Sequence, residues 1–108
     1  MRIDVNTGKP ILANRLGGLS GPAIKPVAVG MVFRVRRAVK IPILGLGGIM
    51  TGEDAAEFLM AGADAVSIGT ASFADPIAPL RIRNELIQFM ARKGYATIQE
   101  LKDGYRED

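Results

Sequence analysis

The side chains that most often perform enzyme chemistry are absent from this sequence, so its glycine-rich turns carry the functional signal. The 108 residues include neither cysteine nor histidine. A thiol nucleophile, a zinc site of Cys and His ligands, and acid–base catalysis by an imidazole are therefore excluded for these residues. Two turns remain, Gly47-Gly48 and Gly69-Thr70, each directly after a short apolar run. Glycines at such points leave backbone N–H groups open to an anion such as phosphate. We therefore predict a phosphate pocket formed by Gly47, Gly48, Gly69 and Thr70, with neither a catalytic residue nor a metal site.

The elements expected from hydrophobic periodicity, capping residues and Gly/Pro breaks place both turns at strand ends. They are a hairpin over 1–14, an irregular loop over 15–22, helices over 26–40, 51–61, 79–93 and 97–104, and strands over 41–46 and 65–68. Strands separated by helices indicate βαβ units and a parallel sheet. The two turns would then lie at one edge of that sheet, like the loops after strands seven and eight that bind phosphate in many (β/α)8 barrels.

Burial should follow the same pattern. Both strands are expected to be covered on both faces, as in parallel sheets generally. The expected inward residues of the helices over 26–40 and 79–93 are Ala28, Met31, Val32, Val35, Val39, Ile82, Leu86, Ile87 and Met90. Two buried strands are too few for a complete sheet. The sequence therefore predicts an α/β chain that is part of a barrel domain, with hairpin and loop over 1–25 and the last βα units over 26–108.

The composition indicates a globular protein, with 48% hydrophobic and 23% charged residues. Its net charge of +3 comes partly from Arg34, Arg36, Arg37 and Lys40. This cluster suits a helix C-terminus better than a nucleic-acid surface, because no aromatic residues are interleaved with it. No apolar run is long enough to span a bilayer, and the N-terminus lacks a signal-peptide core. We expect a cytoplasmic location, with neither nucleic acid nor membrane as a partner.

Longer stretches of the sequence resemble dihydroorotate dehydrogenases. The similarity includes the string Gly-Gly-Leu-Ser-Gly-Pro-Ala-Ile-Lys-Pro at 17–26 and continues through Gly45–Ile49, Phe58–Ala63 and Val66–Ala71. It covers essentially the whole chain. Within the family it is greatest to the class whose FMN subunit pairs with a subunit that carries FAD and an iron–sulfur cluster and passes electrons to NAD.

The resemblance implies the C-terminal portion of a flavin-binding (β/α)8 TIM barrel, whose parent protein oxidises dihydroorotate to orotate in pyrimidine biosynthesis. It adds Gly21 as a flavin contact, since a residue without a side chain lets the loop approach the cofactor. The four turn residues would bind the FMN phosphate, and Ser20 would assist them or cap the loop. Lys25 precedes Pro26 at a helix start, and we expect it to have a solvated or structural role. Because the family's catalytic cysteine has no counterpart, the fragment alone is expected to be inactive. It should associate with the remainder of the barrel or with copies of itself.

Two alternatives remain open. The pyrimidine-reducing domain of dihydropyrimidine dehydrogenases has a similar glycine-rich loop and flavin barrel, and upstream sequence would distinguish it. A phosphate- or flavin-binding module without turnover, or a structural half-barrel that assembles with copies of itself, is the other. The absorbance spectrum of the purified protein would show whether a flavin is bound.

Overall fold

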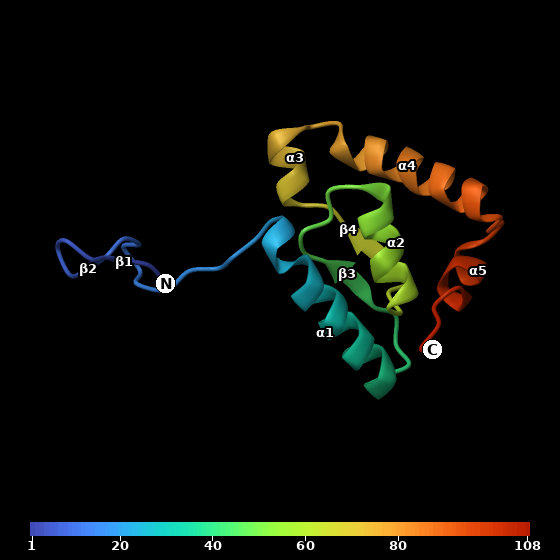
Figure 1. The fold of residues 1–108 in the computed structure, drawn as a ribbon, viewed down its shortest axis with the longest axis horizontal. Helices are drawn as coiled ribbons and strands as arrows, with labels where there is room; N and C mark the ends of the chain where they lie inside the picture. The colour runs from blue at the N-terminus through green and yellow to red at the C-terminus, as the bar shows by residue number, and fades with distance from the viewer.

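An N-terminal arm projects from the body of the molecule (Figure 1). The computed structural model describes residues 1–108 without a gap. Its first elements are β1 (Ile3–Asp4) and β2 (Lys9–Pro10), which pair antiparallel. The turn between them contains Gly8 at φ 68°, and the carboxylate of Asp4 accepts a hydrogen bond from the Asn6 N–H. Such turn residues favour a tight reversal, and the predicted hairpin is confirmed.

The chain enters the body through an irregular loop and a long helix. Residues 11–21 form neither helix nor strand, and a short 3-10 turn, η1 (Pro22–Ile24), leads into α1 (Lys25–Ala38). A proline lies in the first turn of each element. Its missing N–H costs no hydrogen bond there, because N–H groups of the first turn have no acceptor within the helix. The loop is confirmed as irregular, and α1 ends two residues earlier than predicted.

Two short parallel strands lie within the body. β3 (Leu44–Leu46) pairs with β4 (Ala65–Ser67) in parallel, which confirms the predicted strand pair. β3 begins three residues later than predicted. In the preceding residues, Pro42 has no N–H to donate, and the Ile43 N–H donates to the Asp64 carboxylate rather than to a strand.

One face of the strand pair is covered and the other is open, which corrects the prediction of two buried faces. Gly45 is buried beneath α2 (Gly52–Met60), because an added Cβ would lie 2.7 Å from the Phe58 ring. Its neighbours Leu44 and Leu46 point to the opposite face, since side chains alternate along a strand, and are 57% and 62% exposed. In a complete barrel, side chains from all strands fill this interior. This chain contributes only one parallel pair to it.

The remaining helices begin and end at residues that the sequence indicated. Thr51 forms the predicted capping box at the start of α2. α4 (Ala78–Lys93) ends at Gly94 in the left-handed conformation, with φ 77°. α5 (Ile98–Asp103) is capped by a threonine, as expected. The five-residue helix α3 (Thr70–Ala74) was not predicted.

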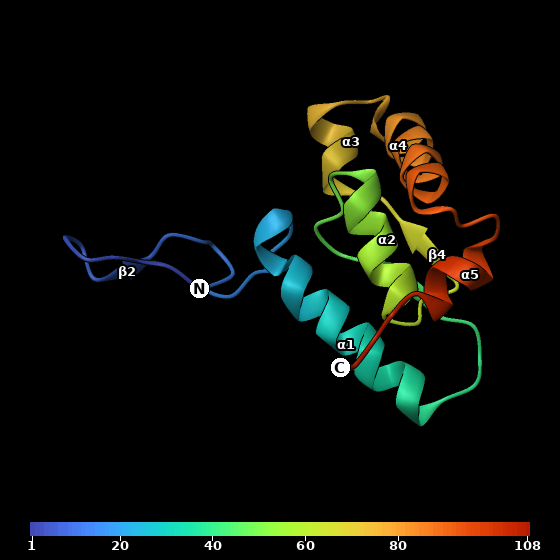
Figure 2. The ribbon, with the colours of Figure 1, turned by 45° about the vertical axis from the view of Figure 1, so that its right-hand side comes forward.

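Helix α2 lies against both strands, flanked by α1 on one side and by α4 and α5 on the other (Figures 1 and 2). The C-terminal segment returns to α1, where the rings of Tyr105 and Phe33 meet edge-on with centroids 5.7 Å apart. No helix combines the length and apolarity needed to cross a bilayer. The main core consists of Val32, Ile49, Ala55, Phe58, Ala61, Ala63, Ala71, Ala78 and Ile82.

The predicted inward stripes of α1 and α4 are confirmed in part, because Ala28, Val32, Ile82, Leu86 and Met90 pack in the core. In α1, Met31 and Val35 are 54% and 46% exposed, while Phe33 packs against the core instead. In α4, Ile82 is buried as predicted, but Ile87 is 50% exposed. Met31 and Val35 line a groove with the exposed side chains of β3, so this side of α1 lies beside the uncovered face of the sheet.

Candidate phosphate site

A cavity of about 260 Å³ lies where the two parallel strands end. The Gly47-Gly48 turn directly follows β3. Only Ile68 separates β4 from Gly69-Thr70. All four residues line the cavity, so the structure brings together the two turns that the sequence singled out. The remaining lining residues are Leu19, Ser20, Ile24, Leu46, Ile49 and Ser67.

Two of these glycines have opposite surroundings. Gly48 has φ +76°, and a Cβ there would lie 2.6 Å from the Gly21 carbonyl oxygen and 3.1 Å from the Lys25 backbone nitrogen. Both its conformation and its packing therefore require glycine. A Cβ on Gly69 would meet no heavy atom within 4 Å. Gly69 thus borders open space, whereas Gly48 packs against the start of α1 and contributes backbone to the cavity.

Backbone N–H groups and hydroxyls are the hydrogen-bond donors of the cavity. The N–H groups of Gly47, Gly48 and Gly69 have no backbone acceptor, and Ser67 and Thr70 supply hydroxyls. No charged side chain lines the cavity. Unpaired N–H groups at the ends of parallel strands are a recurrent way to bind anions through backbone dipoles. The donor set therefore fits a phosphate group.

The loop before α1 approaches the cavity through two residues. Ser20 lines it, which is consistent with an assisting role. Gly21 is buried at φ 93° and does not line the cavity. Its carbonyl accepts a hydrogen bond from the Ile24 N–H at 3.1 Å. It lies between Gly48 and Thr70, whose methyl would be 3.9 Å from an added Cβ on Gly21. Gly21 packs against Gly48 outside the cavity lining, and its contact with flavin stays a prediction.

Lys25 joins α1 to α2 and does not line the cavity. Its Nζ donates to Asp54 Oδ1 at 2.5 Å and to Glu57 Oε1 at 2.7 Å. These two hydrogen bonds raise the pKa of Lys25. Partial burial opposes ionisation of Asp54, but hydrogen bonds from Lys25 and from the Met50 N–H lower its pKa overall. The arrangement agrees with the structural role expected for Lys25.

Sequence reasoning missed several lining residues. Ser67 is the polar one, and it is paired in register with Leu46. Residues paired across neighbouring strands have side chains on the same face, so a serine at the end of an apolar strand was an available signal. Leu19 and Ile24 reach the cavity through the loop and η1, and their place depends on tertiary packing.

Comparisons with known proteins agree on one family. The family model described as dihydroorotate dehydrogenase matches residues 1–90. The chain is 55% identical over 101 residues to the dihydroorotate dehydrogenase B (NAD(+)) catalytic subunit of Geobacter metallireducens, covering 94% of this chain and 33% of that protein. It is 56% identical over 101 residues to a putative dihydroorotate dehydrogenase A (fumarate) of Solibacter usitatus, with the same 94% and 33% coverage. It also matches the crystal structure of Eimeria tenella DHODH in complex with ferulenol, with a TM-score of 0.75 and 31% identity, covering 80% of this chain and 24% of that one.

The chain thus spans about a third of the length of these curated relatives. The alignment with the solved structure covers 80% of this chain and 24% of that one. The fold class predicted from the sequence, the C-terminal portion of a (β/α)8 barrel, is confirmed.

Proposed function

This chain belongs to the dihydroorotate dehydrogenase family, and on that premise we propose that its cavity binds the phosphate of FMN. The family is flavin-dependent, and the parent protein would oxidise dihydroorotate to orotate. The observation that carries the proposal is the convergence of Gly47-Gly48 and Gly69-Thr70 on one cavity, with N–H groups that lack backbone acceptors. We prefer it to the dihydropyrimidine dehydrogenase alternative because the matching family model is that of dihydroorotate dehydrogenase.

The size of the cavity supports binding of the phosphate rather than of the whole cofactor. Its volume of about 260 Å³ lies below the range of roughly 300–1,000 Å³ typical of small-molecule pockets. The isoalloxazine ring and the substrate would need further contacts, which we assign to other parts of the barrel. This chain would anchor the cofactor by its phosphate.

Anchoring and orientation are the contributions that we assign to this chain. When bound, FMN supplies the hydride acceptor for substrate oxidation. The N–H groups of Gly47, Gly48 and Gly69 would fix the phosphate, and the Thr70 hydroxyl would add a further donor. Substrate oxidation also requires a base to remove a proton, and the sequence contains neither cysteine nor histidine. We assign no catalytic residue to this chain and expect it to be inactive alone.

The partner of the parent protein is a finer proposal. The Geobacter relative is named a catalytic subunit of the NAD(+) type, which supports the presence of a second subunit. That this subunit carries FAD and an iron–sulfur cluster is implied by the family resemblance. The Solibacter relative has nearly the same identity and is named for fumarate, so identity does not separate the two electron acceptors. Co-purification of the full-length parent protein, followed by iron and FAD analysis, tests for such a partner.

Titration with FMN, followed by flavin fluorescence, tests the phosphate assignment. We expect weak, saturable binding that inorganic phosphate competes away. Riboflavin lacks the phosphate and should bind roughly tenfold more weakly, which corresponds to about 1.4 kcal/mol. Equal affinities for FMN and riboflavin would contradict the assignment. An orotate-formation assay on the same preparation should give no product, and orotate production by the pure chain would contradict the absence of a catalytic group.

A further inference from the structure

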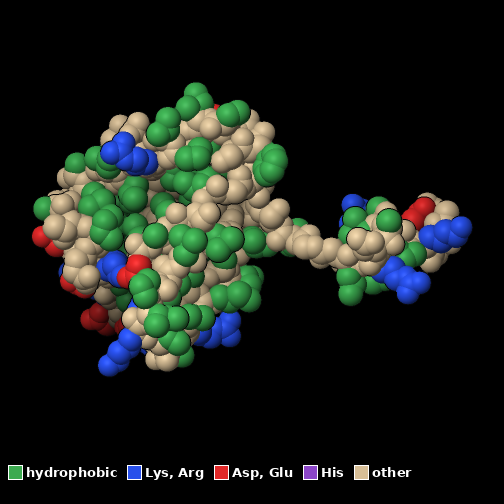
Figure 3. All heavy atoms as spheres, turned by 180° about the vertical axis from the view of Figure 1, so that it is seen from behind, with side chains coloured by type: hydrophobic (Ala, Val, Ile, Leu, Met, Phe, Trp, Pro, Cys, Tyr) green, Lys and Arg blue, Asp and Glu red, His purple; other side chains and the backbone are tan.

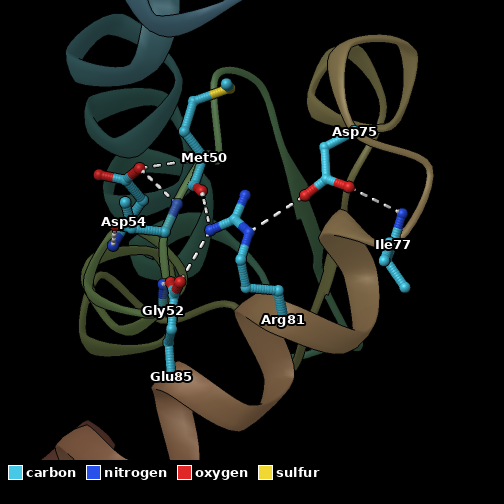
Figure 4. Close-up of polar contacts among 8 residues, drawn as sticks. Met50, Gly52, Asp54, Asp75, Ile77, Arg81 and Glu85 are labelled. Atoms are coloured by element: carbon cyan, nitrogen blue, oxygen red, sulfur yellow. Dashed lines mark hydrogen bonds and ion pairs between the residues drawn. The ribbon is translucent and has the colours of Figure 1, made fainter.

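Side chains from two helices hold the segment that follows the Gly47-Gly48 turn. Asp54 Oδ2 accepts hydrogen bonds from the N–H groups of Met50, at 2.9 Å, and Thr51, at 3.0 Å. Glu85 Oε2, from α4, accepts from the Gly52 N–H at 2.8 Å. Three successive N–H groups are therefore already bonded (Figure 4). An anion at this loop is left with the N–H groups nearer the strand, from Gly47 to Ile49, and the loop's position depends on α2 and α4.

Arg81 connects this loop to the other half of the site. Its Nη1 donates to the Met50 carbonyl at 3.3 Å and to Glu85 Oε1 at 2.8 Å, and its Nε donates to Asp75 Oδ2 at 3.2 Å. Asp75 directly follows α3, the helix that begins at Thr70, and its other carboxylate oxygen accepts from the Ile77 N–H. Figure 4 shows the guanidinium between the Met50 carbonyl and the Asp75 carboxylate.

Arg81 is placed to hold the two turns without touching a bound anion. Arg81 does not line the cavity. Its side chain is 41% exposed and that of Glu85 is 36% exposed, and ion pairs this exposed contribute little to folding stability. The hydrogen bonds from Arg81 and the Gly52 N–H lower the pKa of Glu85, so the pair stays charged at neutral pH. The directional bonds of Arg81 matter more, because the planar donors of its guanidinium reach Met50, Asp75 and Glu85 at once.

We propose that Arg81 is a positioning residue of the phosphate site, which sets the separation between the Gly47-Gly48 turn and Gly69-Thr70. The inference rests on the proposed phosphate-binding function and adds a residue to it. Hydrogen bonds weaken steeply with distance and angle, so an anion held from two turns requires both at the correct spacing. The bond to Met50 places one turn, and the bond to Asp75 places the other through α3.

Replacement of Arg81 by methionine tests the proposal, because methionine keeps the length of the side chain without its donors. FMN and inorganic phosphate are titrated into the ¹⁵N-labelled 108-residue chain, and the amide shifts of Gly47, Gly48 and Gly69 are followed. In the unsubstituted chain the three amides should report one dissociation constant. In Arg81→Met we expect about tenfold weaker binding of both probes, the scale of coupling carried by residues outside a site, with little change in Tm.

A matched control lies two residues away on the same helix. Arg83 is exposed and shares none of the Arg81 contacts, so Arg83→Met removes the same charge without breaking the bridge and should leave both affinities unchanged. Arg81→Lys should not restore binding, because one ammonium cannot reproduce the planar set of bonds. If Arg81→Met does not fold, Asp75→Asn decides instead, since it removes the charge that pairs with Arg81 while keeping an oxygen for Ile77.

The outcomes separate this inference from the function on which it rests. Absence of FMN and phosphate binding in the unsubstituted chain would defeat the phosphate assignment itself. Binding by the unsubstituted chain that Arg81→Met and Asp75→Asn leave unchanged would overturn the positioning role alone. Equal losses in Arg81→Met and Arg83→Met would also overturn it, because they would indicate a general effect of positive charge.

Discussion

Among single residues, two glycines matter to the cavity for different reasons. Gly48 is enclosed by the Gly21 carbonyl and the start of α1, whereas Gly69 faces open space. A side chain at Gly48 therefore disturbs packing, while one at Gly69 disturbs the space available to a ligand.

Gly69→Ala should weaken FMN binding by about tenfold, or roughly 1.4 kcal/mol, because its methyl group would occupy space at the cavity. An added Cβ would meet no heavy atom within 4 Å, so the stability of the chain should change little. Fluorescence titration and urea unfolding measure the two effects. Gly30→Ala, in open space within α1, is the control and should stabilise the chain by about 0.5–1 kcal/mol without changing FMN affinity.

Gly48→Val should lower the stability of the chain as well as abolish FMN binding. A β-branched residue at φ +76° costs roughly 1–3 kcal/mol, and its Cβ would lie 2.6 Å from the Gly21 carbonyl oxygen. The loss of binding then follows from displacement of the Gly21 loop and the start of α1. Urea unfolding checks this cause. Unchanged stability with lost binding would instead place the new side chain inside the cavity.

At the scale of the element, Asp64 holds together segments that meet just before β4. Its carboxylate accepts from Lys102 on α5 at 2.7 Å, from Arg36 on α1 at 2.5 Å, and from the Ile43 N–H at 2.8 Å. Arg36 also donates to the Gly62 carbonyl. The basic end of α1 is thus used in packing, which fits the sequence-based interpretation of that cluster as a helix terminus.

The stability supplied by Asp64 should depend on pH in the acid range. Hydrogen bonds from Lys102 and the Ile43 N–H lower its pKa from 3.8 to about 2. A carboxyl group with a depressed pKa stabilises the folded state fully above its unfolded value, and the contribution is lost as the pH falls toward its folded value. Asp64→Asn should therefore be less stable than the unsubstituted chain at pH 7, and the difference should shrink between pH 3.8 and about 2. Urea unfolding across this range measures it, and a difference independent of pH would contradict the assignment.

At the scale of the whole molecule, the chain is less compact than an independent domain. Its radius of gyration is 16.8 Å, against about 13 Å expected for a compact chain of this length. The arm accounts for part of the excess, and Figure 3 shows the slender stretch that joins it to a body with apolar side chains across its surface. The groove on the open side of the strand pair is lined by Ala28, Met31, Val32, Val35, Ile43, Leu44 and Leu46.

The isolated chain should self-associate through this open side, because exposed strand edges and apolar faces favour pairing. Leu44→Asn should shift the assembly toward monomer in sedimentation velocity at matched concentrations. Leu80→Asn is the control, because Leu80 on α4 is 61% exposed, close to the 57% of Leu44, but lies outside the groove. Equal effects of the two substitutions would indicate non-specific association. A monomeric unsubstituted chain at high concentration would contradict the prediction.

Features that depend only on neighbouring residues could be predicted from the amino-acid sequence. The Thr51 capping box, the stop at Gly94 and the hairpin turn follow from short-range hydrogen bonds and backbone conformation, and such signals are local. Alternation of helices and strands also implied that Gly47-Gly48 and Gly69-Thr70 would share a sheet edge, because consecutive βαβ strands run parallel. The functional interpretation of these turns and the cytoplasmic location stay predictions.

The covered surfaces and the pairs of polar groups that meet could not be predicted, because they depend on how the elements pack. The open face at Leu44 and Leu46 depends on how many strands are present to oppose it, and no pattern within β3 contains that number. Lys25 pairs with Asp54, and Arg81 bridges Met50 and Asp75, across separations along the chain of up to 31 residues. Periodicity specifies which way a side chain points along its own element, whereas the partner that it reaches is set by how the elements pack.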